Sequence, residues 1–274
     1  MSSTAVIIHL LGAAALLVLG LAILRKGMDQ AFGSRMRIFL GVGTSNRGKA
    51  FGVGFLTTLV LQSSTATAIM TSSFVEQGLI LLPMSLAVML GADMGTSIVS
   101  QLVSLKITIL SPTFILLGVA LPKFLKNRRG EGLGRSFVGL GLMLLALKLM
   151  GEATDPIRES TIIQTLFGML GDVPFAAVVA SGLMAAATAS SLAVVLFVLS
   201  LYQAGAIDPL LAIYFVAGAN LGGALPPFFV VGHNHAARQV IAGNLTMRLI
   251  GTLLVTWIVP LFPDEIRSFA SAWG

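Results

Sequence analysis

Long apolar stretches separated by short polar segments run through nearly the whole chain. A helix that crosses a membrane needs roughly 20 mostly apolar residues. Stretches of this length, or slightly shorter, lie at residues 6–24, 79–105, 107–121, 136–150, 206–231 and 240–261. The pattern therefore predicts an all-α polytopic membrane protein with six full spans.

Two further apolar stretches, 50–70 and 174–201, carry clusters of hydroxyl and amide side chains. The linker 123–135 is strongly basic, and basic loops usually face the cytoplasm. Counting both polar stretches as full spans would move this linker to the opposite side. We therefore predict that each stretch is a re-entrant hairpin, which enters and leaves on one side. Both chain termini are then extracytoplasmic, in a multi-pass protein of the cytoplasmic (inner) membrane.

The composition excludes several classes of protein. Hydrophobic residues make up 56% of the 274 residues and charged residues 10%, far below the roughly 25% charged residues of a soluble domain. A soluble enzyme, a disordered segment and a nucleic-acid-binding module are therefore excluded. The net charge of +6 indicates which loops face the cytoplasm, because Lys and Arg are enriched in cytoplasmic loops. The chain has no cysteine, P-loop or HExxH motif, so we expect no enzymatic activity and no organic cofactor.

The chain also contains an internal repeat. The offset that carries Ser63 onto Ser190 also carries Ser64 onto Ser191, and it carries the Gly-Ala-Asx-x-Gly segment 91–95 onto 218–222. Each copy is a span, a hairpin, an interrupted span and another span, so three crossings give the copies opposite orientations, as in many secondary transporters. The predicted organisation is repeat 1 (1–122), a basic cytoplasmic linker (123–135), repeat 2 in inverted topology (136–262) and a C-terminal tail (263–274).

Polar groups inside the apolar stretches indicate a binding site. We expect 91–95 and 218–223 to make their transmembrane helices discontinuous, which frees carbonyls for a cation such as sodium. The hairpin tips at 62–65 and 190–192 begin helices whose N-terminal amides suit an anion, and both tips are expected to meet at mid-membrane. In the structural alternative, the hydroxyls bond their own helices and the glycines permit close packing. Asp93 either neutralises a bound cation or carries a proton.

The segment 54–67, Gly-Phe-Leu-Thr-Thr-Leu-Val-Leu-Gln-Ser-Ser-Thr-Ala-Thr, and the later Gly-Ala-Asp-Met-Gly-Thr-Ser at 91–97 resemble the type II sodium-dependent phosphate cotransporter family. That family has a Gln-Ser-Ser-Ser signature and a Gly-Ala-Asn-x-Gly-Thr element in each of two inverted repeats. The resemblance implies an alternating-access symporter that couples sodium influx to phosphate uptake. A second copy of the chain, in a homodimer, is among the expected partners. The resemblance assigns the substrate to Gln62, Ser63, Ser64, Thr65, Ser190 and Ser191. It assigns sodium to Asp93, Thr96, Asn220, Gln62 and Ser63.

The second repeat departs from this pattern. Ala189 stands where the second Gln belongs, Leu192 replaces a hydroxyl residue and Gly223 replaces a Thr, while in the first repeat Asp93 replaces an Asn. Several alternatives therefore stay open: phosphate transport with an additional cation at Asp93, sodium- or proton-coupled transport of another small anion or organic solute, and a channel or non-transporting scaffold with the same fold. Sodium-coupled phosphate uptake is the function that the sequence favours.

Overall fold

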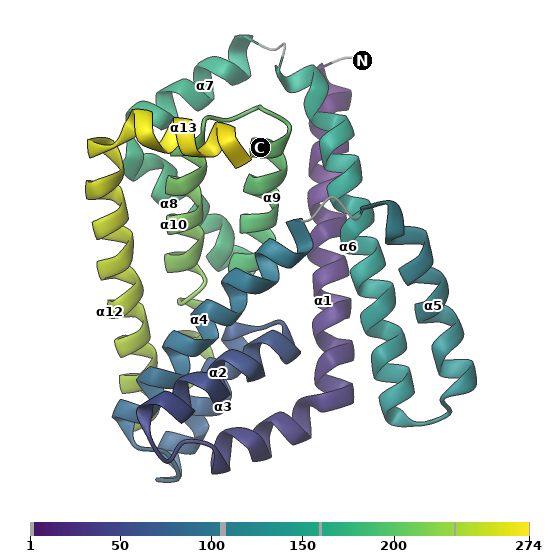
Figure 1. The fold of residues 1–274 in the computed structure, drawn as a ribbon, viewed down its shortest axis with the longest axis vertical. Helices are drawn as coiled ribbons and strands as arrows, with labels where there is room; N and C mark the ends of the chain where they lie inside the picture. Colours follow the sequence, from purple (N-terminus) through teal and green to yellow (C-terminus); the bar gives the residue numbers. More distant parts are fainter. Residues whose placement is uncertain (1–2, 105–107, 159–160, 233, 274) are drawn as a thin grey trace. The chain divides into compact units, whose positions relative to one another are not determined.

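The computed structural model describes residues 3–104, 108–158, 161–232 and 234–273, and these residues form helices and no strand (Figure 1). The all-α prediction is therefore confirmed. In chain order the helices are α1 (Ser3–Val42), α2 (Arg47–Leu61), α3 (Ser64–Glu76), α4 (Leu82–Ser104), α5 (Ser111–Phe124), α6 (Arg128–Arg158), α7 (Thr161–Asp172), α8 (Pro174–Ala187), α9 (Ser191–Gln203), α10 (Pro209–Gly222), α11 (Pro226–Val230), α12 (His235–Ile258) and α13 (Pro263–Trp273). Two 3-10 turns, η1 (Thr108–Leu110) and η2 (Val259–Leu261), precede α5 and follow α12.

Five helical stretches of the described residues are long and apolar enough to cross a membrane, against the six that we expected. They are Ile8–Val42, Leu82–Val103, Arg128–Thr154, Pro209–Val230 and His235–Leu261. The remaining expected span, 107–121, corresponds to α5, which has 14 residues and is about 21 Å long at 1.5 Å per residue, short of the roughly 30 Å hydrocarbon core. Pro112 lies in the first turn of α5 and favours a helix start there, which limits its length.

The chain forms two compact units. Unit 1 comprises Met1–Val18, Leu145–Gly223 and Met247–Gly274, and unit 2 comprises Leu19–Leu144 and Ala224–Thr246. The first predicted hairpin, α2 with α3, lies in unit 2, whereas the second, α8 with α9, lies in unit 1. These units do not coincide with the predicted repeats, whose boundaries stay a prediction.

The same local arrangement occurs once in each unit. In unit 2, α2 and α3 are joined by a tight turn and both pack against α4; in unit 1, α8 and α9 do the same against α10. The offset between Ser63 and Ser190 also relates the helix starts, with Pro174 as the counterpart of Arg47, Ser191 of Ser64 and Pro209 of Leu82. The offset that relates a few polar residues therefore also relates three consecutive helices.

Helix α4 is continuous through Gly91 and Gly95, so the predicted interruption at 91–95 is wrong. A Cβ at Gly91 would clash with the Phe51 carbonyl oxygen, and one at Gly95 would lie 2.9 Å from the Phe55 carbonyl oxygen. The glycines therefore let the backbone of α4 lie directly on that of α2, as small residues do between membrane helices. Close packing, the alternative interpretation of these glycines, is the one that the structure supports.

The glycines of the second copy act in the same way. A Cβ at Gly218 would clash with the Val178 carbonyl oxygen, and one at Gly222 with the Gly182 carbonyl oxygen. At the repeat offset, Val178 and Gly182 are the counterparts of Phe51 and Phe55. Helix α10 runs through Gly218 and ends at Gly222, and three residues separate it from α11. The second helix is therefore interrupted from Gly223, the last residue of the predicted segment 218–223, up to the start of α11.

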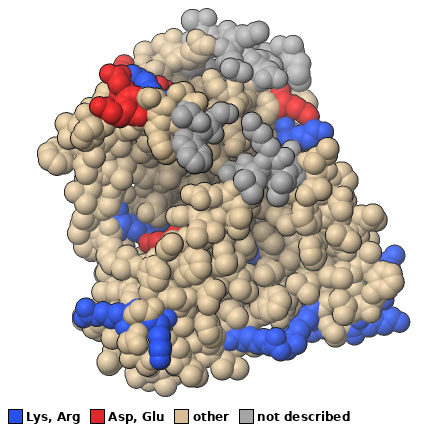
Figure 2. Space-filling model, viewed as in Figure 1, with Lys and Arg blue, Asp and Glu red and all other residues tan. Residues whose placement is uncertain are grey.

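Basic side chains gather at one end of unit 2, over the C-terminal part of α1 and the α5–α6 connection (Figure 2). Gln30 joins α1 to the start of α6, since its Nε2 donates to the Arg128 carbonyl at 3.3 Å and its Oε1 accepts from Arg135 Nη1 at 3.0 Å. Helix α6 begins at Arg128, inside the predicted linker 123–135. This grouping is the one that the positive-inside rule expects of a cytoplasmic end.

Candidate functional site

The turn between α2 and α3 contains the first cluster of predicted site residues. Gln62 ends α2 in the left-handed region, with φ of 56° and ψ of 29°, and its N–H donates to the Thr58 carbonyl at 2.8 Å. The Ser63 hydroxyl accepts a 3.1 Å hydrogen bond from the Ala66 N–H and caps α3. The chain thus reverses within two residues, and the structure brings Gln62, Ser63, Ser64 and Thr65 together at the N-terminus of α3.

Hydroxyl groups join the two helices of this hairpin just behind its tip. Thr58 Oγ1 and Thr67 Oγ1 are 2.8 Å apart, and Thr67 Oγ1 also donates to the Ser63 carbonyl at 3.2 Å. Both threonines are fully buried, and Ser64 is nearly so. Because a buried hydrogen bond between helices fixes their separation, this pair holds the tip closed.

Several buried polar atoms of unit 2 have no hydrogen-bond partner among the described residues. They are Thr57 Oγ1, Gln62 Oε1, Thr71 Oγ1, Ser72 Oγ and Asn244 Oδ1. Four of the five belong to the α2–α3 hairpin, so this hairpin concentrates uncommitted oxygen atoms. Of these residues, sequence reasoning selected Gln62 for the site. The signal for the others was their polarity within an apolar segment, which does not by itself separate a binding residue from a packing residue.

The turn between α8 and α9 repeats the backbone of the first tip with different side chains. Ala189 has a φ of 49° in place of Gln62, and the Ser190 hydroxyl accepts from the Ala193 N–H at 3.1 Å. Ser190 and Ser191 are both buried. A Cβ at Gly223, just after α10, would lie 2.7 Å from the Ser191 Cβ. The end of α10 therefore lies against this tip.

The residues predicted to bind sodium lie on the helices beside the two tips. Asp93 and Thr96 are half-buried on α4, which packs on α2, and Thr96 Oγ1 donates to the Ala92 carbonyl at 3.1 Å. Asn220 is exposed in the last turn of α10. Among the described residues, no group of three or more His, Cys, Asp or Glu residues is placed to hold a metal ion.

Two arginines donate to main-chain carbonyls of predicted site residues. Arg25 Nε of α1 donates to the Gln62 carbonyl at 2.8 Å in unit 2, and Arg248 Nη1 of α12 donates to the Asn220 carbonyl at 2.7 Å in unit 1. Arg248 is almost fully buried. Sequence reasoning did not assign either arginine to the site, because a bond to a main-chain carbonyl depends on the fold and leaves no pattern in the side chains.

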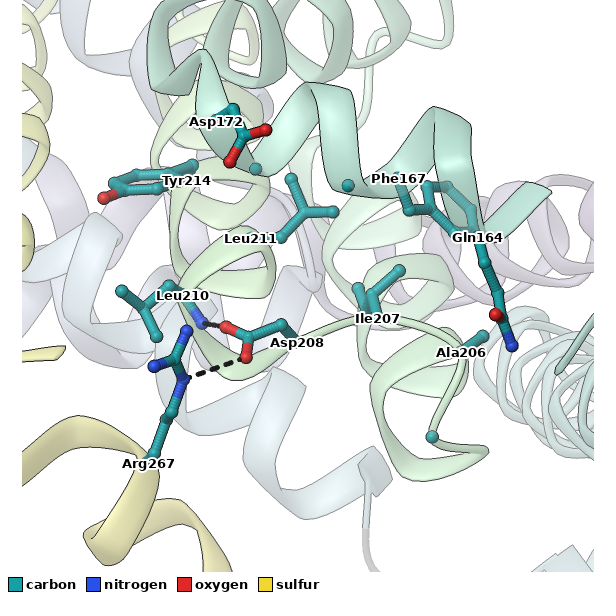
Figure 3. A pocket seen from close by; sticks show the side chains of 13 residues that line it. Gln164, Phe167, Asp172, Ala206, Ile207, Asp208, Leu210, Leu211, Tyr214 and Arg267 are labelled. Atoms are coloured by element: carbon teal, nitrogen blue, oxygen red, sulfur yellow. Dashed lines mark hydrogen bonds and ion pairs between the residues drawn. The ribbon is translucent and has the colours of Figure 1, made fainter. Parts of the chain in front are cut away.

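A cavity of about 530 Å³ in unit 1 is lined by α7, the start of α10 and α13 (Figure 3). Asp208 accepts hydrogen bonds there from the Leu210 N–H at 2.8 Å, which caps α10, and from Arg267 Nε at 3.1 Å. Both side chains of this ion pair are about half exposed, so the pair adds little to stability. None of the predicted site residues lines this cavity.

Comparison with known proteins agrees with the sequence pattern. The sequence model of the Na+/Pi-cotransporter family matches residues 16–152, half of the chain. The matched segment contains the whole α2–α3 hairpin and α4. No solved structure matches the chain.

Similar proteins include two named "Putative inorganic phosphate export protein YjbB", with 38% identity over 262 residues in Escherichia coli (strain K12) and 39% over 251 residues in Salmonella typhimurium. These alignments cover 95% and 91% of the chain but 48% and 46% of the relatives, so the chain spans about half their length. "Uncharacterized protein YqeW" of Bacillus subtilis is 25% identical over 92% of the chain and 84% of its own length. Because the family model matches half of the chain, this multi-pass membrane protein belongs to the Na+/Pi-cotransporter family.

Proposed function

We propose that this chain translocates inorganic phosphate across the membrane and couples the movement to sodium. The family match and the name of the YjbB relatives support phosphate as the substrate. Within the molecule, the proposal depends chiefly on one observation: Gln62 and Ser63 turn the chain so that α3 begins with a Ser-Ser-Thr run at a tip. Gln62, Ser63, Ser64 and Thr65 are the residues that we assign to phosphate.

The chemistry of the tip suits an oxyanion. The first amides of α3 have no carbonyl partner within their own helix, and the positive end of the helix dipole favours a negative charge. The hydroxyls of Ser64 and Thr65 can donate to phosphate oxygens. Ser190 and Ser191 offer a second, less polar tip for the same substrate, and the sharing of one site by both tips stays a prediction from the repeat.

Sodium coupling is supported by the uncommitted oxygen atoms of the first hairpin. Gln62 Oε1 and Thr57 Oγ1 are buried without a partner among the described residues, and such atoms cost about 1–3 kcal/mol each. A hard cation with oxygen ligands would remove this cost. We therefore keep Asp93, Thr96, Asn220, Gln62 and Ser63 as the proposed sodium ligands and add Thr57.

We further propose that the two hairpins are re-entrant and that the repeats are inverted. Helices α2, α3, α8 and α9 have 15, 13, 14 and 13 residues, or about 20 Å each, too short to cross a hydrocarbon core of roughly 30 Å. The basic end of unit 2 supports a cytoplasmic placement of the α5–α6 connection. Alternating access in such carriers is a rocking of one repeat against the other.

The direction of transport is a separate question. Entry of sodium with phosphate favours uptake when net positive charge moves, because the membrane potential contributes about 2.3 kcal/mol per charge per 100 mV. The YjbB relatives are named for export, which favours a second candidate: sodium-independent phosphate efflux down its own gradient. Both candidates use the same tip, and they differ in the ion that moves with phosphate.

Purified protein in proteoliposomes tests the proposal. Labelled phosphate flux is measured in both directions with sodium replaced by potassium, and with the sodium gradient imposed inward or outward. We expect phosphate to accumulate on the side to which sodium flows. Gln62→Ala and Ser64→Ala should reduce this flux to background, because each removes a group assigned to the ligand.

Gln77→Ala is the matched control for Gln62→Ala, since Gln77 lies in the same hairpin, is exposed and bonds Ser73. It should leave the flux unchanged. Phosphate flux that is equal in sodium and potassium would contradict coupling and favour the efflux candidate. The absence of any phosphate flux in the parent protein would contradict both.

A further inference from the structure

Helices α1 and α6 form a closely packed pair within unit 2. A Cβ at Gly132 would lie 2.7 Å from the Gly27 carbonyl oxygen, and one at Gly139 would lie 2.6 Å from the Gly20 carbonyl oxygen. The two contact glycines lie seven residues apart on each helix. The earlier glycine of α1 faces the later glycine of α6, so the two helices are antiparallel neighbours (Figure 1). Backbone contact at two successive levels fixes the rotation of α1 about its axis.

This fixed rotation directs one charged side chain at the first hairpin tip. Arg25 lies between Gly20 and Gly27 on α1, and its Nε donates to the Gln62 carbonyl at 2.8 Å. Gln62 directly follows α2, in a left-handed conformation, so its carbonyl cannot accept the next bond of that helix. A hydrogen bond from a charged donor is about twice as strong as one between neutral groups. Arg25 therefore ties the turn itself to the α1–α6 pair.

A hollow lies beside this bond. A hollow of about 310 Å³ in unit 2 is lined by α1, α4 and α6 and by Gln62. Its polar lining residues are Gln62 and Ser136, and the others are apolar, including Leu24 next to Arg25. Apolar side chains offer the Gln62 carbonyl no hydrogen bond that would replace the one from Arg25.

Among the described residues of the second repeat, the counterpart of Arg25 does not make this bond. At the repeat offset, the counterpart of Arg25 is Glu152, whose carboxylate lies 3.8 Å from Lys148 Nζ on the surface of α6. An ionised carboxylate cannot donate a hydrogen bond to a carbonyl. The tie between an arginine and the turn is therefore a property of the polar tip and not of the hairpin fold.

We infer that Arg25 is a positioning residue, which latches the first hairpin tip to the α1–α6 pair and so keeps the N-terminus of α3 in the phosphate-binding position. Its part in transport rests on the proposed function, whereas the latch itself is a local structural property. Release of the latch lowers the fraction of molecules whose tip is competent to bind. The apparent affinity for phosphate then falls by that fraction, while binding at saturating phosphate restores the tip.

A single-thiol reporter tests the latch. The chain has no cysteine, so Ala66→Cys, in the first turn of α3, supplies a single thiol whose maleimide reaction rate reports opening of the tip. Arg25→Gln and Arg25→Lys are compared in this background. Lys26→Gln is the matched control, because Lys26 is exposed and its loss removes the same charge next to the same site.

We expect Arg25→Gln to raise the labelling rate and the KM for phosphate by roughly tenfold or more, the factor that corresponds to losing a charged hydrogen bond of about 1.4 kcal/mol. The kcat should change less, inorganic phosphate should slow the labelling again, and Arg25→Lys should restore part of both values. Lys26→Gln should behave like the parent. If Arg25→Gln does not fold, the smaller increase in labelling rate and KM expected for Arg25→Lys tests the latch.

Labelling rate and KM that are unchanged in the Arg25 variants would overturn the latch, as would equal changes in Lys26→Gln. Faster labelling of Arg25→Gln in a protein that moves no phosphate would support the latch and contradict the proposed function. The two conclusions can therefore fail separately.

Discussion

The α2–α3 and α8–α9 hairpins have nearly the same backbone and very different side chains. Ser63 and Ser190, the second residue of each turn, have φ and ψ values of −153° and 102°, and of −151° and 99°. Gln62 and Ala189 before them have φ of 56° and 49°. The turn therefore needs a residue that accepts the left-handed conformation and a serine cap, and it does not need the glutamine. The Gln62 Nε2 donates to the Leu59 carbonyl at 3.0 Å, and its Oε1 has no partner among the described residues.

Several hydroxyl residues of the first hairpin have apolar counterparts in the second, whereas three of its serines are matched by serines. The buried Thr58–Thr67 pair corresponds to Ala185 and Val194, both also buried. The other replacements, read at the same offset, are Met184 for Thr57, Leu192 for Thr65, Val198 for Thr71 and Leu199 for Ser72. Replacing both partners of a buried hydrogen bond by apolar groups is nearly neutral for stability. The second hairpin therefore forms without this polar set, which agrees with the binding role that we propose for the first hairpin.

The largest effect on stability that we expect concerns the close glycine packing that both copies share. Gly91→Ala and Gly218→Ala each place a Cβ against a main-chain carbonyl, so each should lower the free energy of unfolding by about 1–3 kcal/mol. Gly52→Ala, where the added Cβ meets nothing within 4 Å, is the control and should be neutral or slightly stabilising. Thermal unfolding in detergent measures all three. A loss in one copy alone would show that the two packing contacts are not equivalent.

A smaller effect is expected where the two copies differ in charge, since Asp93 of the first copy corresponds to Asn220 of the second. If the Asp93 carboxylate binds sodium, Asp93→Asn should weaken the sodium dependence of phosphate flux roughly tenfold, which equals about 1.4 kcal/mol. If it carries a proton instead, the variant should lose the pH dependence of flux. Flux titrated with sodium at several pH values distinguishes the two. No change in either dependence would assign Asp93 a structural role.

The smallest expected effect is the loss of a helix cap. Ser63→Ala and Ser190→Ala each remove one hydrogen bond to an N-terminal amide and should each destabilise the protein by about 1 kcal/mol. Both should also weaken phosphate binding, because both serines are assigned to the substrate. Chemical unfolding and phosphate KM are measured on the same preparations. A change in KM confined to Ser63→Ala would restrict substrate binding to the first tip.

The helical class was predictable from the sequence, and so was the spacing of the two hairpins. The offset between Ser63 and Ser190 also separates the starts of three helices in each copy. The interruption expected at 91–95 was wrong because glycines that interrupt a helix and glycines that let two helices pack closely occur in the same sequence pattern. Helix continuity depends on a neighbour, here Phe51 on α2, which no local sequence signal identifies.

The candidate site was predictable where side chains themselves do the chemistry. Gln62 and Ser63 were selected from their polarity and lie together at the expected turn. Arg25 and Arg248 were not selected, because both act on main-chain carbonyls and the partner of such a bond is set by tertiary contact. Asn244, buried with an unpartnered oxygen among the described residues, became visible only once its helix was packed.

Asp208 makes two contacts at the start of α10. Asp208 caps the start of α10 and accepts from Arg267 of α13, while Arg248 holds the Asn220 carbonyl near the other end. A helix of 14 residues is about 21 Å long. The far end of α10 lies beside Ser191, so one helix connects the contact with α13 to the second tip.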